Sequence, residues 1–107
     1  MAFAQDYTVP EPSRSQVEAL RGVSVLEFGA PWCGYCRRAE PLIAEALGAH
    51  PATHHIKIED GSHRRLGRLF GVKLWPTLVI LNDGKEVARI VRPTSAEAIQ
   101  SALTGIL

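Results

Sequence analysis

The stretch Trp32-Cys33-Gly34-Tyr35-Cys36 contains both cysteines of this 107-residue chain. Residues 23–28, which precede it, are typical of a β-strand, and a helical pattern starts at Cys33. A cysteine at the start of a helix has its thiolate stabilised by the helix dipole and by unpaired backbone N–H groups. The stretch therefore predicts a redox-active pair in which Cys33 attacks a disulfide. Cys36, one turn further along, then resolves the intermediate.

Two other interpretations of the cysteines account for less of the surrounding sequence. The thiols are buried and unreactive in the first, and in the second they form half of a structural zinc site. Zinc needs four ligands, and no histidine lies at a zinc-finger spacing from the cysteines. We therefore expect neither a metal nor a cofactor.

The composition is that of one ordinary globular domain. The chain is 46% hydrophobic and 21% charged, with a net charge of +1. This charge gives no reason to expect nucleic acid or a membrane surface as a partner. We expect a single domain over residues 1–107, with residues 1–12 as an N-terminal arm. A cytoplasmic location is expected because no leader peptide precedes the strand, or a periplasmic one if a leader has been removed.

The hydrophobic pattern predicts alternating strands and helices, and therefore an α/β domain. Strands separated by helices should pair parallel, and the turn at residues 82–85 should form an antiparallel hairpin. We expect a mixed sheet of four or five strands with helices on both faces. Capping boxes, which open helices, are predicted at Ser13 with Gln16 or Ser15 with Glu18, and at Thr94 with Glu97. The expected strands are residues 23–28, 54–59, 77–81 and 86–91, with a short one near 3–9, and the main helix runs from Cys33 to Leu47.

Four features give the chain a resemblance to the thioredoxin superfamily over residues 13–105. They are the Trp-Cys-x-x-Cys motif at 32–36, a proline inside the helix at Pro41, an acidic residue (Glu27) six positions before the first cysteine, and Trp75-Pro76-Thr77. The resemblance implies a thioredoxin fold. It also implies a thiol–disulfide oxidoreductase that reduces protein or small-molecule disulfides and is regenerated by a reductase or a thiol donor.

The resemblance also implies roles for individual residues. Glu27 matches a buried acid that exchanges a proton with the resolving cysteine, and Lys57 matches the partner of that acid. Pro76 matches a cis proline that faces the disulfide, and the backbone of Trp75 then binds an extended substrate. The substrate-binding residues would be Trp32, Gly34, Tyr35, Trp75 and Pro76.

Three departures from the thioredoxin pattern keep other functions open. The dipeptide between the cysteines is Gly-Tyr rather than Gly-Pro, Trp75 is unusually bulky, and Arg92-Pro93 replaces a glycine. Gly-Tyr also occurs in periplasmic disulfide isomerases, so a disulfide oxidase or isomerase is an alternative. A non-catalytic peptide-binding module is another alternative, and a metal- or cluster-binding dimer is a weaker one. A monomer is the expected state.

Overall fold

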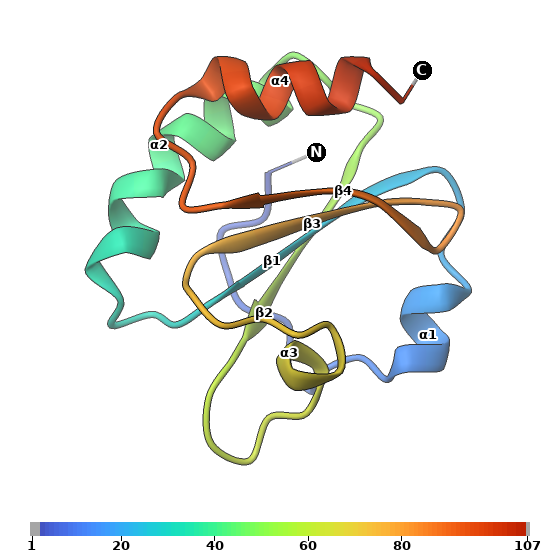
Figure 1. The fold of residues 1–107 in the computed structure, drawn as a ribbon, viewed down its shortest axis with the longest axis vertical. Helices are drawn as coiled ribbons and strands as arrows, with labels where there is room; N and C mark the ends of the chain where they lie inside the picture. Colours follow the sequence, from blue (N-terminus) through green and yellow to red (C-terminus); the bar gives the residue numbers. More distant parts are fainter. Residues whose placement is uncertain (1–2, 107) are drawn as a thin grey trace.

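The computed structural model describes residues 3–106, in which four strands form one sheet (Figure 1). The strands are β1 (Val23–Gly29), β2 (His54–Glu59), β3 (Thr77–Asn82) and β4 (Lys85–Val91), and the helices are α1 (Arg14–Glu18), α2 (Gly34–Gly48), α3 (Leu66–Leu69) and α4 (Ala96–Thr104). The strands lie in the order β2-β1-β3-β4.

The strand directions confirm a mixed sheet but correct one expectation. β1 pairs parallel with β2, whereas β3 is antiparallel to both β1 and β4. The chain leaves β2 beside the end of β1, where Glu59 pairs with Gly29, and enters β3 at that same end, where Thr77 pairs with Phe28. The four-residue helix α3 does not carry the chain back along the sheet. A helix between two strands therefore produced parallel pairing only for β1 and β2.

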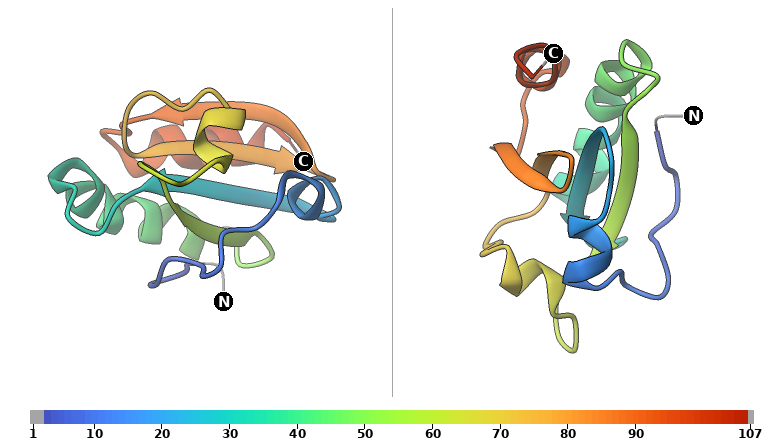
Figure 2. Two further views of the ribbon diagram at one scale, coloured as in Figure 1. Left: turned by 90° about the horizontal axis from the view of Figure 1, so that it is seen from below. Right: turned by 90° about the vertical axis from the view of Figure 1, so that its right-hand side faces the viewer.

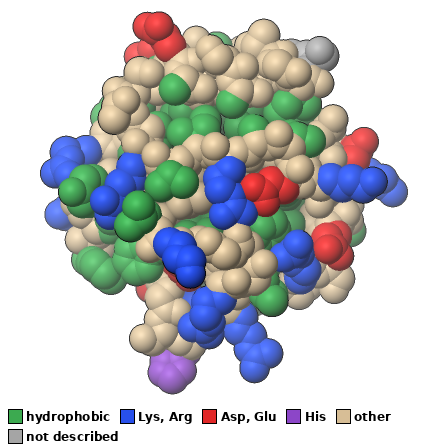
Figure 3. All heavy atoms as spheres, viewed as in Figure 1, with side chains coloured by type: hydrophobic (Ala, Val, Ile, Leu, Met, Phe, Trp, Pro, Cys, Tyr) green, Lys and Arg blue, Asp and Glu red, His purple; other side chains and the backbone are tan. Residues whose placement is uncertain are grey.

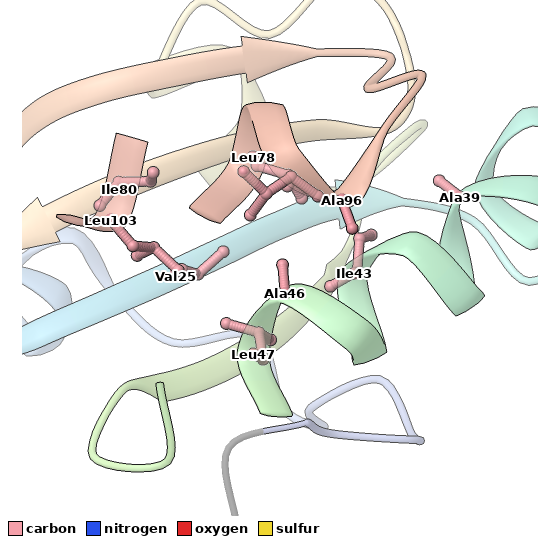
Figure 4. Close-up of a cluster of buried hydrophobic side chains, with 10 residues drawn as sticks. Val25, Ala39, Ile43, Ala46, Leu47, Leu78, Ile80, Ala96 and Leu103 are labelled. Carbon is pink, nitrogen blue, oxygen red and sulfur yellow. The ribbon is translucent and has the colours of Figure 1, made fainter. Parts of the chain in front are cut away.

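Helices cover both faces of the sheet, as expected. α2 and α4 lie on one face and α1 and α3 on the other (Figures 1 and 2). Side chains alternate between the faces along each strand. Val25, Leu78 and Ile80 pack with α2 and α4 (Figure 4), and Leu26 and Val79 pack on the opposite side. Because β1 and β3 are central and covered twice, their side chains are almost completely buried.

The N-terminal arm, described by the structure from residue 3 onward, runs along the outer edge of β2 (Figure 2). The short strand expected near residues 3–9 is reduced to a single parallel bridge between Tyr7 and Lys57. In this bridge the Thr8 N–H donates to the Lys57 carbonyl at 2.8 Å. Further contacts come from side chains, including a tilted stacking of Phe3 on His55 at 5.2 Å between ring centroids. The arm therefore covers β2 mainly through side-chain contacts.

The helix starts follow the predicted capping chemistry with one shift. Ser13 and Gln16 form the expected capping box of α1. The cap of α4 is Ser95 rather than Thr94, because the Ser95 hydroxyl accepts from the Ala98 N–H at 3.2 Å. Local sequence thus located the helix start to within one residue.

Candidate functional site

The two cysteines lie at the start of α2, where the chain leaves the end of β1. Cys33 is the N-cap residue, and its Sγ accepts from the Cys36 N–H at 3.2 Å. Both thiols are free, and Cys33 is 7% exposed against 3% for Cys36. Unpaired N–H groups at a helix start favour negative charge. Cys33 is thus the slightly more exposed cysteine and Cys36 the more deeply buried one.

Burial controls the ionisation of Cys36. Burial, followed by the hydrogen bond with Cys33, raises the pKa of this thiol to about 12. The charge of Glu27 also acts to raise this pKa. Cys36 is therefore a neutral thiol near pH 7, and it must lose a proton before it attacks another sulfur.

Gly29 provides the space that the Cys36 sulfur occupies. A Cβ atom at Gly29 would lie 2.6 Å from Cys36 Sγ and 3.4 Å from the Tyr7 hydroxyl oxygen. The first of these distances is far below a normal van der Waals contact. The close packing of β1 against α2 at this point therefore requires glycine.

We expect Gly29→Ala to lower the free energy of unfolding by about 1–3 kcal/mol, because it overpacks the site beneath Cys36. Gly48→Ala is the matched control, since a Cβ there meets nothing within 4 Å inside α2. This control should be neutral or raise stability by up to about 1 kcal/mol. Denaturant unfolding of the reduced proteins measures both changes. Equal stabilities of the two variants would contradict the packing argument.

Glu27 is buried in β1 on the face that carries Gly29, and its partner is His55. Both side chains are fully buried, with His55 Nε2 and Glu27 Oε1 2.8 Å apart. The Ala4 N–H lies 2.7 Å from His55 Nδ1 and donates to it. Nδ1 therefore carries no proton, and Nε2–H donates to the carboxylate. Glu27 Oε2 is buried without a hydrogen-bond partner among the described residues, so it is available to hold a proton.

Lys57 does not pair with Glu27, although the two residues lie opposite each other in β1 and β2. Its ammonium group donates to Glu40 Oε1 and to the Gln5 carbonyl, each at 3.1 Å. It also lies 4.6 Å from the centre of the Tyr7 ring. The long lysine side chain reaches the arm and α2, where the Gln5 carbonyl and Glu40 accept its hydrogen bonds. Glu27 is therefore bonded to His55 and not to Lys57.

The arm forms one wall of a pocket next to the inner cysteine. This pocket of about 260 Å³ is lined by Tyr7, Cys36, Glu40 and Lys57, among others. Burial raises the pKa of the Tyr7 hydroxyl above its usual range, and the nearby Cys36 and Glu27 add to this effect. The hydroxyl therefore stays protonated. Sequence patterns did not identify His55, Tyr7 or Glu40, because their roles depend on contacts between distant segments.

The groove beside Cys33 is built around the Trp75–Pro76 peptide bond, which has the expected cis geometry. The rings of Trp32 and Trp75 meet edge to face, with centroids 5.3 Å apart. The Trp75 indole N–H donates to Asp60 Oδ2 at 2.9 Å, which holds the ring in place. A pocket of about 330 Å³ lies between these rings and Cys33. All five residues expected to bind substrate lie beside this groove or the adjoining pocket.

Arg92 lies in the same groove. Its backbone has a positive φ of 50°, and its Nε donates to the Trp75 carbonyl at 2.8 Å. The guanidinium lies 3.8 Å from the centre of the Tyr35 ring, and that of Arg38 lies 4.7 Å from it. The two arginines and the tyrosine thus form a cationic and aromatic border beside Trp75.

Residues 3–106 contain no cluster of three or more His, Cys, Asp or Glu side chains able to hold a metal ion. The His55 side chain is engaged with Glu27 and the Ala4 N–H. None of the described helices is both long enough and apolar enough to cross a bilayer.

Comparison with known proteins agrees with the fold. The solved structure of thioredoxin 2 from Pseudomonas aeruginosa PAO1 in its reduced form is 47% identical, has a TM-score of 0.86, and is matched over 97% of this chain and 96% of that one. The thioredoxin of Chlamydia muridarum is 39% identical over 71 residues, which are 65% of this chain and 69% of that protein. Thioredoxin-2 of Pyricularia oryzae is 32% identical over 80 residues, or 73% of this chain, and the match spans only 47% of that protein.

The family model described as thioredoxin matches residues 7–105, which is nearly the whole chain. The matched range includes the cysteine pair at the start of α2, the acid in β1 and the cis proline before β3. The chain therefore belongs to the thioredoxin family.

Proposed function

We propose that this protein is a thiol–disulfide oxidoreductase that reduces disulfides of proteins and small molecules through Cys33 and Cys36. The observation that carries the proposal is an N-cap cysteine paired with a more deeply buried, neutral cysteine whose pKa is raised in part by a buried carboxylate. Such an arrangement separates an attacking thiolate from a resolving thiol. The similarity to thioredoxins of comparable length supports it.

The reaction proceeds in two exchange steps. The Cys33 thiolate attacks one sulfur of the substrate disulfide, forms a mixed disulfide and displaces the other sulfur as a thiolate. Cys36 then loses its proton and attacks Cys33 Sγ, which releases the second substrate thiolate. Two electrons pass from the cysteine pair to the substrate, and the pair becomes a disulfide. A reductase or an external thiol returns the two electrons.

Glu27 is the base in the second step of this proposal. Because Cys36 has a pKa of about 12, its proton needs an acceptor as it attacks. Glu27 Oε2 is buried and unpartnered among the described residues, on the face of β1 toward which Cys36 points. His55 holds the other oxygen of the carboxylate and so orients the group. Lys57 acts indirectly, through Glu40 and the arm.

Substrate binding is assigned to the groove at Trp75 and Pro76. An extended peptide lying beside the cis bond places its disulfide over Cys33, and Trp32, Gly34 and Tyr35 border the pocket there. The proposal also places the protein in the cytoplasm, because a reducing compartment keeps such a pair in the dithiol form. The proposed oligomeric state is a monomer.

The direction of electron flow is tested by measuring the reduction potential of the pair together with insulin reduction supported by a dithiol. A reductant should have a potential near about −270 mV and should accelerate insulin precipitation. A value near about −120 mV without insulin reduction would instead identify an oxidant of the kind that Gly34-Tyr35 leaves open.

A further inference from the structure

The substrate groove is bordered by positively charged side chains that have no ion-pair partner within residues 3–106. We propose that Arg92 and Arg38 select disulfide substrates with an acidic residue beside the cysteine. This inference rests on the proposed function, because it concerns which peptide the groove presents to Cys33.

Hydrogen bonds hold both the backbone and the side chain of Arg92 in place. Its N–H donates to the Pro76 carbonyl at 2.9 Å, and its Nε donates to the Trp75 carbonyl at 2.8 Å. The other two guanidinium nitrogens have no hydrogen-bond or ion-pair partner within residues 3–106. A guanidinium fixed by one nitrogen presents the others in a planar fork that suits a carboxylate.

The position of Arg92 places this fork on the path of a bound peptide. The pockets of about 330 Å³ and 340 Å³ on either side share only Tyr35 and Arg92 as lining residues, and the first of them contains Cys33. A carbonyl oxygen accepts two hydrogen bonds, so Arg92 and a substrate N–H can share the Trp75 carbonyl. A residue next to the substrate cysteine therefore lies within reach of Arg92.

The charges around the groove all have the same sign. Arg38 and Lys73 complete the border, and no Asp or Glu lines either pocket. Asp60, the nearby acid, is bonded to the Trp75 indole. In Figure 3, Lys/Arg and hydrophobic side chains interleave at the left-hand edge, where Figure 1 shows the start of α2 and the end of β4.

Three of the other arginines differ from this pair. Arg14, Arg64 and Arg89 each have a carboxylate of the protein within 4 Å, so their charges are already compensated. Because the net charge of the whole chain is only +1, the positive field at the groove is a local property. An acidic peptide segment complements it without any general attraction to polyanions.

The test uses disulfide peptides that are identical except for Glu, Gln or Lys beside the cysteine. Reduction by the full-length protein is followed in single turnover. At low salt we expect the Glu peptide to react about five- to tenfold faster than the Gln peptide and the Lys peptide to react more slowly. This advantage should fall toward onefold at 0.5 M salt, because screening weakens exposed ion pairs. Equal rates for the Glu and Gln peptides would overturn the inference.

Variants connect any preference to the two arginines. Arg92→Gln and Arg38→Gln should each reduce the Glu-to-Gln rate ratio, whereas Arg68→Gln, an exposed change in α3, should leave the ratio unchanged. If Arg92→Gln disturbs the chain that follows β4, Arg38→Gln still tests the inference. If the Glu-to-Gln rate ratio is unchanged in both variants, the inference is overturned. If none of the peptides is reduced, the proposed function itself fails, whereas reduction without charge preference removes only this inference.

Discussion

Replacing Cys33 with serine should lower the rate of disulfide reduction by roughly a thousandfold or more, because the attacking thiolate is removed. A serine hydroxyl is not ionised near pH 7 and does not exchange with disulfides. The insulin assay measures this loss, and denaturant unfolding checks that the variant folds as the parent does. Parent-like reduction by Cys33→Ser would contradict both the proposed function and the role of Cys33.

Cys36→Ser is the complementary variant, because it separates attack from resolution. Cys33 should still attack, but the mixed disulfide should persist, since Cys36 no longer displaces the substrate. Mass spectrometry should then find one substrate attached per chain, at Cys33. Accumulation of the adduct on Cys36 in the Cys33→Ser variant instead would reverse the two assignments.

Replacing Glu27 with glutamine should slow the resolving step by roughly a hundredfold at pH 7, because Cys36 loses its proton acceptor. The amide keeps a carbonyl oxygen that accepts from His55 Nε2, so the buried hydrogen bond is preserved. Rapid mixing with a disulfide peptide, monitored by tryptophan fluorescence, separates attack from resolution. The attack step should change much less than the resolving step.

The pH dependence of this variant provides a second readout. The pKa of Cys36 is about 12, so between pH 7 and 9 the thiolate fraction rises about tenfold per pH unit. Without a base, resolution in Glu27→Gln should follow this rise, while the parent should change less steeply. A parallel pH profile in both proteins would contradict the role of Glu27 as base.

Glu40→Gln is the matched control for this experiment. It removes a carboxylate that is close to the same pocket but half exposed and paired with Lys57. Its effect on resolution should stay within about threefold, because the glutamine oxygen can still accept from the buried Lys57 ammonium group. A loss as large as that of Glu27→Gln would instead assign the proton path to the arm side of the pocket.

Local patterns in the sequence were sufficient for the main helices and strands and for placing the cysteine pair at a helix start. The cysteine spacing at a helix start, the hairpin turn and the apolar strand at 77–81 each depend on neighbouring residues. The structure reproduces them nearly to the residue. The positive φ values of Asp83 and Gly84, at 51° and 81°, are the turn geometry that this residue pair favours.

Contacts between distant segments required the tertiary structure. Only the fold shows that β3 runs antiparallel beside β1, that Glu27 bonds to His55 rather than Lys57, and that Arg92 reaches the Trp75 carbonyl. A long side chain such as that of Lys57 can reach several groups besides the residue opposite it in the neighbouring strand. Which of these groups it bonds depends on the burial and charge of the whole site. The position of the cysteine pair at a helix start is therefore a property of the local sequence. The surroundings of Glu27 and the charge of the groove result from packing, because residues from three or more segments must meet to form them.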